Sequence, residues 1–139
     1  MELFKNTIYK IGQEPAMTSM SGVSEREVDS PSVYGGTENT LNPEEMLVAS
    51  VNSCLMLVFF HFVEKFSIEI NSYDSEAEGQ VEKTKNGLRF TKIEVDAKVS
   101  MGNNTSIERI EEITKLAEKY CLVSGSLTCP VEFNVKVVE

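Results

Sequence analysis

The chain contains eighteen consecutive residues, 46–63, that carry no formal charge when His61 is neutral. A membrane span needs about 20 predominantly apolar residues, and this segment also contains Ser50, Asn52 and Ser53. We therefore predict a helix that is buried inside protein. A helix with so little polar face needs cover on most sides, and a chain of 139 residues has difficulty providing that cover alone. We accordingly expect a second subunit to pack against it.

The start of this helix is marked by four residues, Asn42, Pro43, Glu44 and Glu45. Asparagine caps free amides, and proline suits the first helical position. Two acidic side chains then lie where the helix dipole is positive. We predict a helix that begins at Pro43 and ends at about Phe66.

The segments on either side of this helix favour strands and one further helix. We expect strands at 3–11, 16–20 and 23–29, a loop at 30–40, a hairpin with arms 67–85 and 88–100 around an Asn86–Gly87 turn, a second helix from a capping box at 105–108 to about Cys121, and a last strand at 131–137. Strands joined by short turns imply a largely antiparallel sheet. The sequence therefore predicts a single α+β domain over residues 1–139.

The charge balance bears on the kind of partner. The net charge is −9, and the 13 basic residues are scattered. Nucleic acids and anionic membranes are bound by clusters of Lys and Arg, so we expect neither as the main partner. Three cysteines are an odd number, and the first residues contain no apolar leader. We therefore expect a cytoplasmic protein whose thiols are reduced at rest.

Cys54 lies in the middle of the apolar helix, which raises the question of thiol chemistry. A thiolate reduces a peroxide by attacking one oxygen, and a second thiol converts the resulting sulfenic acid to a disulfide. The attacking thiol needs a lowered pKa, with a cation or hydrogen-bond donor beside it. Helical spacing surrounds Cys54 mostly with aliphatic side chains, and burial alone would raise its pKa. An inert core cysteine and a reactive thiol are both open interpretations.

Two further cysteines follow. Cys121 falls at the end of the predicted second helix, where the dipole disfavours a thiolate, so the resolving role suits it better than the attacking role. Cys129 precedes the last strand, and we interpret it as structural. It stays an alternative to Cys121 as the second thiol.

Glu44 and His61 also lie on the predicted apolar helix. Glu44 lies about 15 Å along the helix axis from Cys54, so its carboxylate cannot touch the sulfur. It could pair with an arginine that spans the gap, or only complement the helix dipole. His61 lies about 10.5 Å from Cys54 along the axis, too far for both to bind one metal ion. With one histidine in the chain, we expect no metal site, and His61 is interpreted as a core or interface residue.

Two segments resemble the cysteine motifs of the OsmC/Ohr family of thiol-dependent hydroperoxide reductases. Residues 42–54 resemble the first motif, which has an Asn-Pro-Glu helix start and a reactive cysteine ten positions after the glutamate. Residues 121–127 resemble the second motif, which begins Cys-Pro in many members; here Leu122 replaces the proline. The hairpin and the last strand also fit, so the resemblance covers nearly the whole chain.

The resemblance implies a fold, an assembly and an activity. Members form intertwined homodimers in which the long apolar helices pack centrally and both active sites lie at the subunit interface. They reduce organic hydroperoxides without a metal or haem cofactor, and some use dihydrolipoyl groups as the reductant. Carried over by position, Cys54 would be the peroxidatic thiol and Cys121 the resolving thiol, while Glu44 would hold an activating arginine. Arg26 is the only arginine before the helix, and we take it as the candidate for that arginine.

Two other functions compete with hydroperoxide reduction. The same fold could serve as a dimeric module that binds a small molecule or handles sulfur, with little peroxidase turnover. A structural dimer with inert thiols is the third alternative. The pKa and the reactivity of Cys54 distinguish the three.

Overall fold

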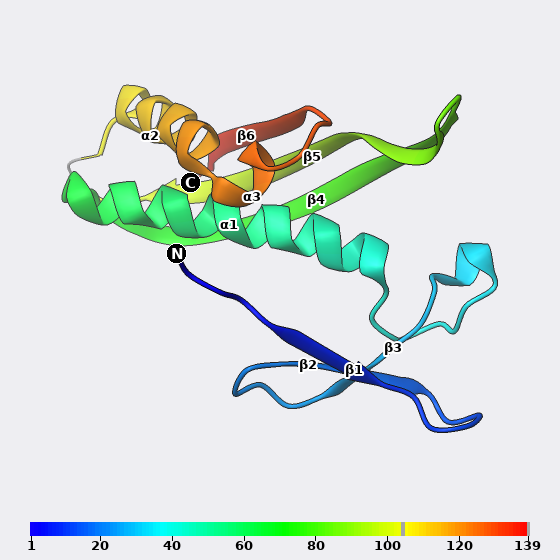
Figure 1. Cartoon of the computed structure of the whole chain (residues 1–139). Coiled ribbons are helices and arrows are strands. Elements are labelled where there is room, and N and C mark those ends of the chain that lie inside the picture. The colour runs from blue at the N-terminus through cyan, green and yellow to red at the C-terminus, as the bar shows by residue number, and fades with distance from the viewer. Residues whose placement is uncertain (104, 139) are drawn as a thin grey trace. The chain divides into compact units, whose positions relative to one another are not determined.

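The computed structural model describes residues 1–103 and 105–138. These residues form two compact units: the first comprises Met1–Leu47, and the second begins at Val48. Strands and helices are mixed along the chain in the order β1-β2-β3-η1-α1-β4-β5-α2-α3-β6 (Figure 1). The α+β class is therefore confirmed. A single domain over residues 1–139 stays a prediction.

The first unit is built on a three-stranded antiparallel sheet. Its strands are β1 (Asn6–Tyr9), β2 (Ala16–Met20) and β3 (Arg26–Val28), in that order. All three predicted strands are present, although β1 and β3 are shorter than expected. The predicted loop at 30–40 contains one short 3₁₀ helix, η1 (Ser32–Tyr34).

Helix α1 (Pro43–Lys65) begins at the predicted residue and ends one residue before the predicted limit. Asn42 caps it: the side-chain oxygen accepts a hydrogen bond from the Glu45 N–H at 2.7 Å. In return, the Asn42 amide donates to the Glu45 carboxylate at 2.6 Å. This reciprocal pair satisfies free groups at the helix start and explains why α1 begins there.

Helix α1 is long and apolar enough to cross a membrane, with a mean hydropathy of 2.0 over its most apolar window. Core helices of soluble proteins meet the same criterion. The side of α1 that is buried within the chain is formed by Val51, Leu55, Phe59, Phe62 and Val63. Only 28% of the most apolar 18-residue stretch of α1 is buried, and Leu57 is 63% exposed. One chain therefore covers one side of α1, and cover by a second subunit stays a prediction.

The second unit contains a sheet of three strands in the order β4 (Ile70–Thr84), β5 (Gly87–Met101) and β6 (Val131–Val138). Strands β4 and β5 form the predicted antiparallel hairpin. Strand β6, however, lies parallel to β5. The largely antiparallel arrangement is confirmed, and β5–β6 is the parallel pairing among the named strands. The chain returns to β5 through helix α2, and a crossover of that kind allows parallel pairing.

The hairpin turn lies one residue before its predicted position. Thr84 pairs with Gly87, so the turn residues are Lys85 and Asn86. Gly87 follows the turn and has φ of 93°, in the left-handed region that glycine adopts without steric cost. The glycine thus identifies the hairpin correctly, although it begins β5 and does not complete the turn.

Helix α2 (Ile107–Tyr120) also starts one residue later than its predicted cap suggests. Its N-cap is Ser106, whose hydroxyl accepts a hydrogen bond from the Arg109 N–H at 3.2 Å. Thr105, the cap expected from the sequence, instead donates to the Glu69 carbonyl at 3.2 Å. The predicted capping box is therefore displaced by one residue, because Thr105 bonds to the segment before β4.

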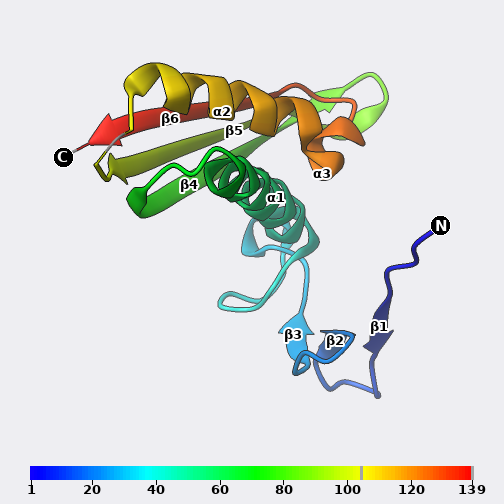
Figure 2. The ribbon, with the colours of Figure 1, turned by 90° about the vertical axis from the view of Figure 1, so that its left-hand side faces the viewer.

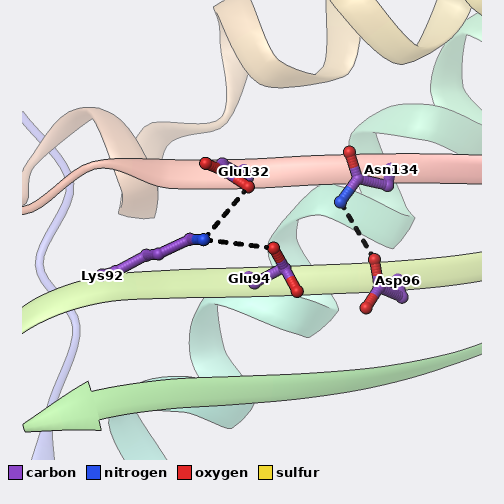
Figure 3. Close-up of polar contacts among 5 residues, drawn as sticks. All are labelled: Lys92, Glu94, Asp96, Glu132 and Asn134. Atoms are coloured by element: carbon purple, nitrogen blue, oxygen red, sulfur yellow. Dashed lines mark hydrogen bonds and ion pairs between the residues drawn. The ribbon is translucent and has the colours of Figure 1, made fainter.

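Helices α1 and α2 and the short helix α3 (Leu122–Gly125) lie on one face of the second sheet (Figures 1 and 2). The alternating residues Ile93, Val95, Ala97 and Val99 of β5 point into the core between sheet and helices. The other face of this sheet is polar. There the Lys92 ammonium lies 3.3 Å from Glu94 and 3.4 Å from Glu132, and Asn134 donates to Asp96 at 2.9 Å (Figure 3).

Candidate functional site

The fold brings the two cysteines of the predicted motifs together. Cys54 is half-buried on α1, and Cys121 is 3% exposed at the junction of α2 and α3. The Cys121 side chain lies in hydrogen-bonding contact with the Cys54 thiol. Both cysteines are free thiols. Two free thiols that interact with one another are placed to form a disulfide, so the arrangement allows a two-thiol redox cycle.

The surroundings of Cys54 act on its pKa in opposite directions. Burial raises the pKa of the Cys54 thiol above its ordinary value, and the neighbouring Cys121 side chain raises it further. The backbone N–H groups of Val123 and Leu122 point at the sulfur and lower the pKa. The net direction is upward, so the neutral thiol is favoured at rest. The two amides are the groups that would stabilise a developing thiolate.

The sequence analysis did not identify these two amides as donors to Cys54. One feature of the sequence, the residue at position 122, could have indicated the Leu122 amide. Leu122 stands where many members of the resembled family have proline, and proline has no N–H to donate. The departure from the motif therefore supplies a hydrogen-bond donor. Donation by Leu122 further requires that α3 begin at this residue, which depends on tertiary structure.

Cys121 lies between two helices, which changes the electrostatic argument made from the sequence. It ends α2, as predicted, but it is also the N-cap residue of α3. Its sulfur accepts a hydrogen bond from the Ser124 N–H at 3.4 Å. The expectation that the end of a helix dipole alone acts on Cys121 was therefore incomplete, because the start of the next turn acts on the same sulfur.

The third cysteine, Cys129, is not the thiol that neighbours Cys54. It is half-buried and packs against the hydrophobic core. The next residue, Pro130, accepts a hydrogen bond from the Ile93 N–H and so ties the segment to β5. This arrangement fits the structural interpretation, and the thiol in contact with Cys54 is Cys121.

Arg26 and Glu44 both belong to the first unit. Arg26 is exposed on β3, where it pairs with Thr18 across the sheet. One carboxylate oxygen of Glu44 is buried and has no hydrogen-bond partner among the described residues. Among those residues no ion pair joins Glu44 to Arg26. An arginine held by Glu44 beside Cys54 therefore stays a prediction.

The two arginines of the second unit have partners of their own. Arg109 forms an ion pair with Glu112 at 3.1 Å, and Arg89 donates to the Thr128 hydroxyl at 3.3 Å. His61 is exposed within the chain, and its ring forms a T-shaped pair with Phe62. Of the two alternatives for His61, the core position does not hold for the single chain, and the interface position stays a prediction. Within the described part of the chain, no group of three or more potential ligands is arranged to hold a metal ion.

A groove with a volume of about 780 Å³ lies between α1 and α2. Its lining includes Val58, one helical turn after Cys54, and Tyr120, the residue before Cys121. Six of the nine lining side chains are aliphatic or aromatic. The thiol pair thus adjoins an apolar groove of the size that small-molecule sites have.

Comparison with known proteins identifies the fold and the family. Residues 36–136 match the family model of OsmC-like proteins. The chain belongs to the OsmC-like family. Among curated relatives, this OsmC-like chain is 22% identical over 103 residues to MJ0573 of Methanocaldococcus jannaschii, an uncharacterized protein. The match covers 73% of the chain and 52% of MJ0573, so the chain spans about half the length of that relative.

Solved structures of OsmC-like proteins superpose on nearly the whole chain. An OsmC-like protein of unknown function from Vibrio cholerae, VCA0330, has a TM-score of 0.88 at 23% identity, covering 97% of this chain and 99% of that one. An organic hydroperoxide resistance protein from Elizabethkingia anophelis has a TM-score of 0.78 at 20% identity, covering 100% and 97%. The predicted OsmC-like fold is therefore confirmed.

Proposed function

We propose that this OsmC-like protein reduces organic hydroperoxides by a two-cysteine mechanism. The contact between the Cys54 and Cys121 side chains carries the proposal. Two cysteines that only fill the core would not need to meet across two helices beside a groove. Structural relatives named organic hydroperoxide resistance proteins support the same chemistry.

The proposed cycle has three balanced steps. The Cys54 thiolate attacks one peroxide oxygen, the O–O bond breaks, and the alkoxide takes a proton and leaves as the alcohol. The Cys54 sulfenic acid then reacts with the Cys121 thiol to form a disulfide and water. A dithiol reductant, for which a dihydrolipoyl group is our candidate, exchanges with this disulfide and returns both thiols. No metal or haem takes part in these steps.

The groups around Cys54 have separate roles in the first step. The N–H groups of Leu122 and Val123 stabilise the thiolate, and the apolar groove favours a peroxide that carries an organic group. We further propose that Arg26 supplies a positive charge near Cys54 and that Glu44 holds it. A charge of that kind would offset the effect of burial on the Cys54 pKa.

We also propose that the active protein is a cytoplasmic homodimer. The exposed side of α1 includes Ala49, Ser53 and Leu57, and the first two are small enough to let another helix approach closely. A second copy would cover this side of α1 and complete the burial that one chain leaves unfinished. With a net charge of −9, neither nucleic acid nor an anionic membrane is proposed as a partner.

One observation favours a second candidate function. Because the pKa of Cys54 is raised by burial, the protein could serve as an OsmC-fold module that binds a small molecule or handles sulfur with little peroxidase activity. Mass spectrometry of the intact reduced protein after one equivalent of cumene hydroperoxide separates the two. We expect loss of two hydrogens in wild type, with peptide mapping showing a Cys54–Cys121 link.

Variants sharpen this experiment. Cys121→Ser should trap an oxidised Cys54, Cys54→Ser should consume no peroxide, and the control Cys129→Ser should behave as wild type. Undiminished activity of Cys54→Ser would refute the assignment. An unreacted wild-type protein would favour the binding module.

A further inference from the structure

Asn52 and Ser53 are neighbouring polar residues in the uncharged segment of α1, and their hydrogen bonds go to different elements. The Ser53 hydroxyl donates to the Ala49 carbonyl at 2.8 Å, within the same helix. The Asn52 side-chain oxygen instead accepts a hydrogen bond from the Ser75 hydroxyl of β4 at 2.8 Å. Both Asn52 and Ser75 are half-buried. A directional polar bond therefore links α1 to the sheet beside the apolar core.

Asn52 and Cys54 lie at the two edges of the buried side of α1. At about 100° per residue, Asn52 lies about 60° to one side of the buried Leu55. Cys54 lies about 60° to the other side of the buried Val51. The first edge is bonded to β4, and the second brings Cys54 to Cys121; Figure 2 shows β4 and α3 on different sides of α1. A rotation of α1 about its own axis therefore moves both contacts together.

Small rotations of α1 matter for the thiol pair because side chains project from the helix axis. Side-chain atoms lie about 5–6 Å from the axis, so a rotation of about 20° moves the Cys54 sulfur by about 2 Å. A displacement of about 1 Å can slow a reaction that depends on alignment by about a hundred-fold. Apolar packing has no direction, and cores lose a unique arrangement before they lose stability. A polar pair at a packing interface, in contrast, can fix one register.

We propose that the hydrogen bond between Asn52 and Ser75 sets the rotation of α1 against β4 and thereby holds Cys54 against Cys121. Asn52 and Ser75 are positioning residues, because both act through Cys54. The inference rests on the thiol pair of the proposed two-cysteine mechanism. It concerns closure of the disulfide and not the attack on peroxide, so its test uses no peroxide.

The test equilibrates each full-length protein with reduced and oxidised glutathione. Forming the Cys54–Cys121 disulfide oxidises the two protein thiols and reduces one oxidised glutathione to two glutathione thiols. Mass spectrometry with peptide mapping gives the fraction of this disulfide, and hence the effective concentration of the Cys121 thiol at Cys54. Ser75→Ala should lower that effective concentration by about ten- to a hundred-fold. Ser75→Thr keeps the hydroxyl and should match wild type.

A double variant separates positioning from stability. Asn52→Leu combined with Ser75→Ala replaces both partners by apolar side chains, so no buried polar group is left without a partner. The midpoint of urea denaturation should therefore stay near that of wild type, while the effective concentration falls as in Ser75→Ala. Ser72→Ala is the matched control, because the Ser72 hydroxyl pairs with that of Ser100 at 2.7 Å and joins β4 to β5. It should leave the effective concentration unchanged.

Three results would overturn the proposal. One is an effective concentration in Ser75→Ala within about two-fold of wild type, and another is an equal fall in Ser75→Ala and Ser72→Ala. The third is a fall that follows the urea midpoint across all the variants, because lost stability would then account for it.

Failure of the reductase activity gives a different result. A wild-type protein that forms the disulfide in glutathione but consumes no peroxide would refute the proposed reductase. If Ser75→Ala still lowered the effective concentration in that protein, the positioning role would stand. Conversely, peroxide consumption by wild type with no change in Ser75→Ala would refute the positioning role alone.

Discussion

Replacing Leu122 by proline tests whether a backbone amide activates Cys54. The Leu122 N–H is one of two backbone donors directed at the Cys54 sulfur, and proline removes it. The substitution suits the local backbone, because Leu122 is the first residue of α3, where proline is favoured. The preceding Cys121 has φ of −71° and ψ of 109°, an extended conformation that a following proline accepts.

The expected change follows from the lost hydrogen bond. A hydrogen bond to a charged group contributes about 1.5–3 kcal/mol. Sulfur accepts more weakly than oxygen, and the Leu122 N–H acts less strongly on Cys54 than the Val123 N–H. We therefore take the lower limit as the upper bound, a rise of at most about one unit in the Cys54 pKa. At pH 7 the thiolate fraction would then fall by at most about ten-fold. The rate of peroxide reduction should fall by a similar or smaller factor.

The assay is the pH dependence of Cys54 alkylation, followed by peptide mass spectrometry. Leu122→Ala is the matched control, since it removes a 74% exposed side chain and keeps the N–H. We expect the alanine variant to titrate as wild type and the proline variant to titrate at higher pH. An unchanged midpoint in Leu122→Pro, or an equal shift in both variants, would contradict the role given to the amide.

Three further predictions concern stability. Phe59→Ala removes a side chain with no solvent exposure and should lower the free energy of unfolding by about 3–5 kcal/mol, measured by urea denaturation. Glu78 and Glu94 are paired across β4 and β5, so Glu78→Lys should stabilise the protein by about 0.2–1 kcal/mol, and the gain should shrink at high salt. Burial raises the pKa of Tyr73, so its stabilising effect is present below the unfolded pKa of about 10 and is lost as pH rises through the folded pKa. Tyr73→Phe should remove that alkaline loss from a series of melting temperatures between pH 8 and pH 11.

Local signals located most of the elements. The cap at Asn42 predicted the start of α1 because a capping side chain, its first-turn partner and the following apolar run lie within a few residues. The alternation around Ile93 identified β5 because period-two burial is a property of the strand itself. Predictions that depended on one residue were less accurate. The predicted cap at Thr105 was displaced by one position because Thr105 bonds to the distant Glu69. The predicted turn was displaced by one position because Gly87 takes its left-handed φ just after the turn.

The sequence by itself determined which atoms are available for chemistry: a thiol at Cys54 inside an apolar helix, a second thiol at Cys121, and an N–H at Leu122 in place of proline. Tertiary structure alone decided that these atoms meet and that β6 pairs in parallel with β5. The physical reason is the distance along the sequence over which each kind of interaction acts. Caps and periodicity act over a few residues, whereas contacts between distant segments depend on how helices and strands share one core.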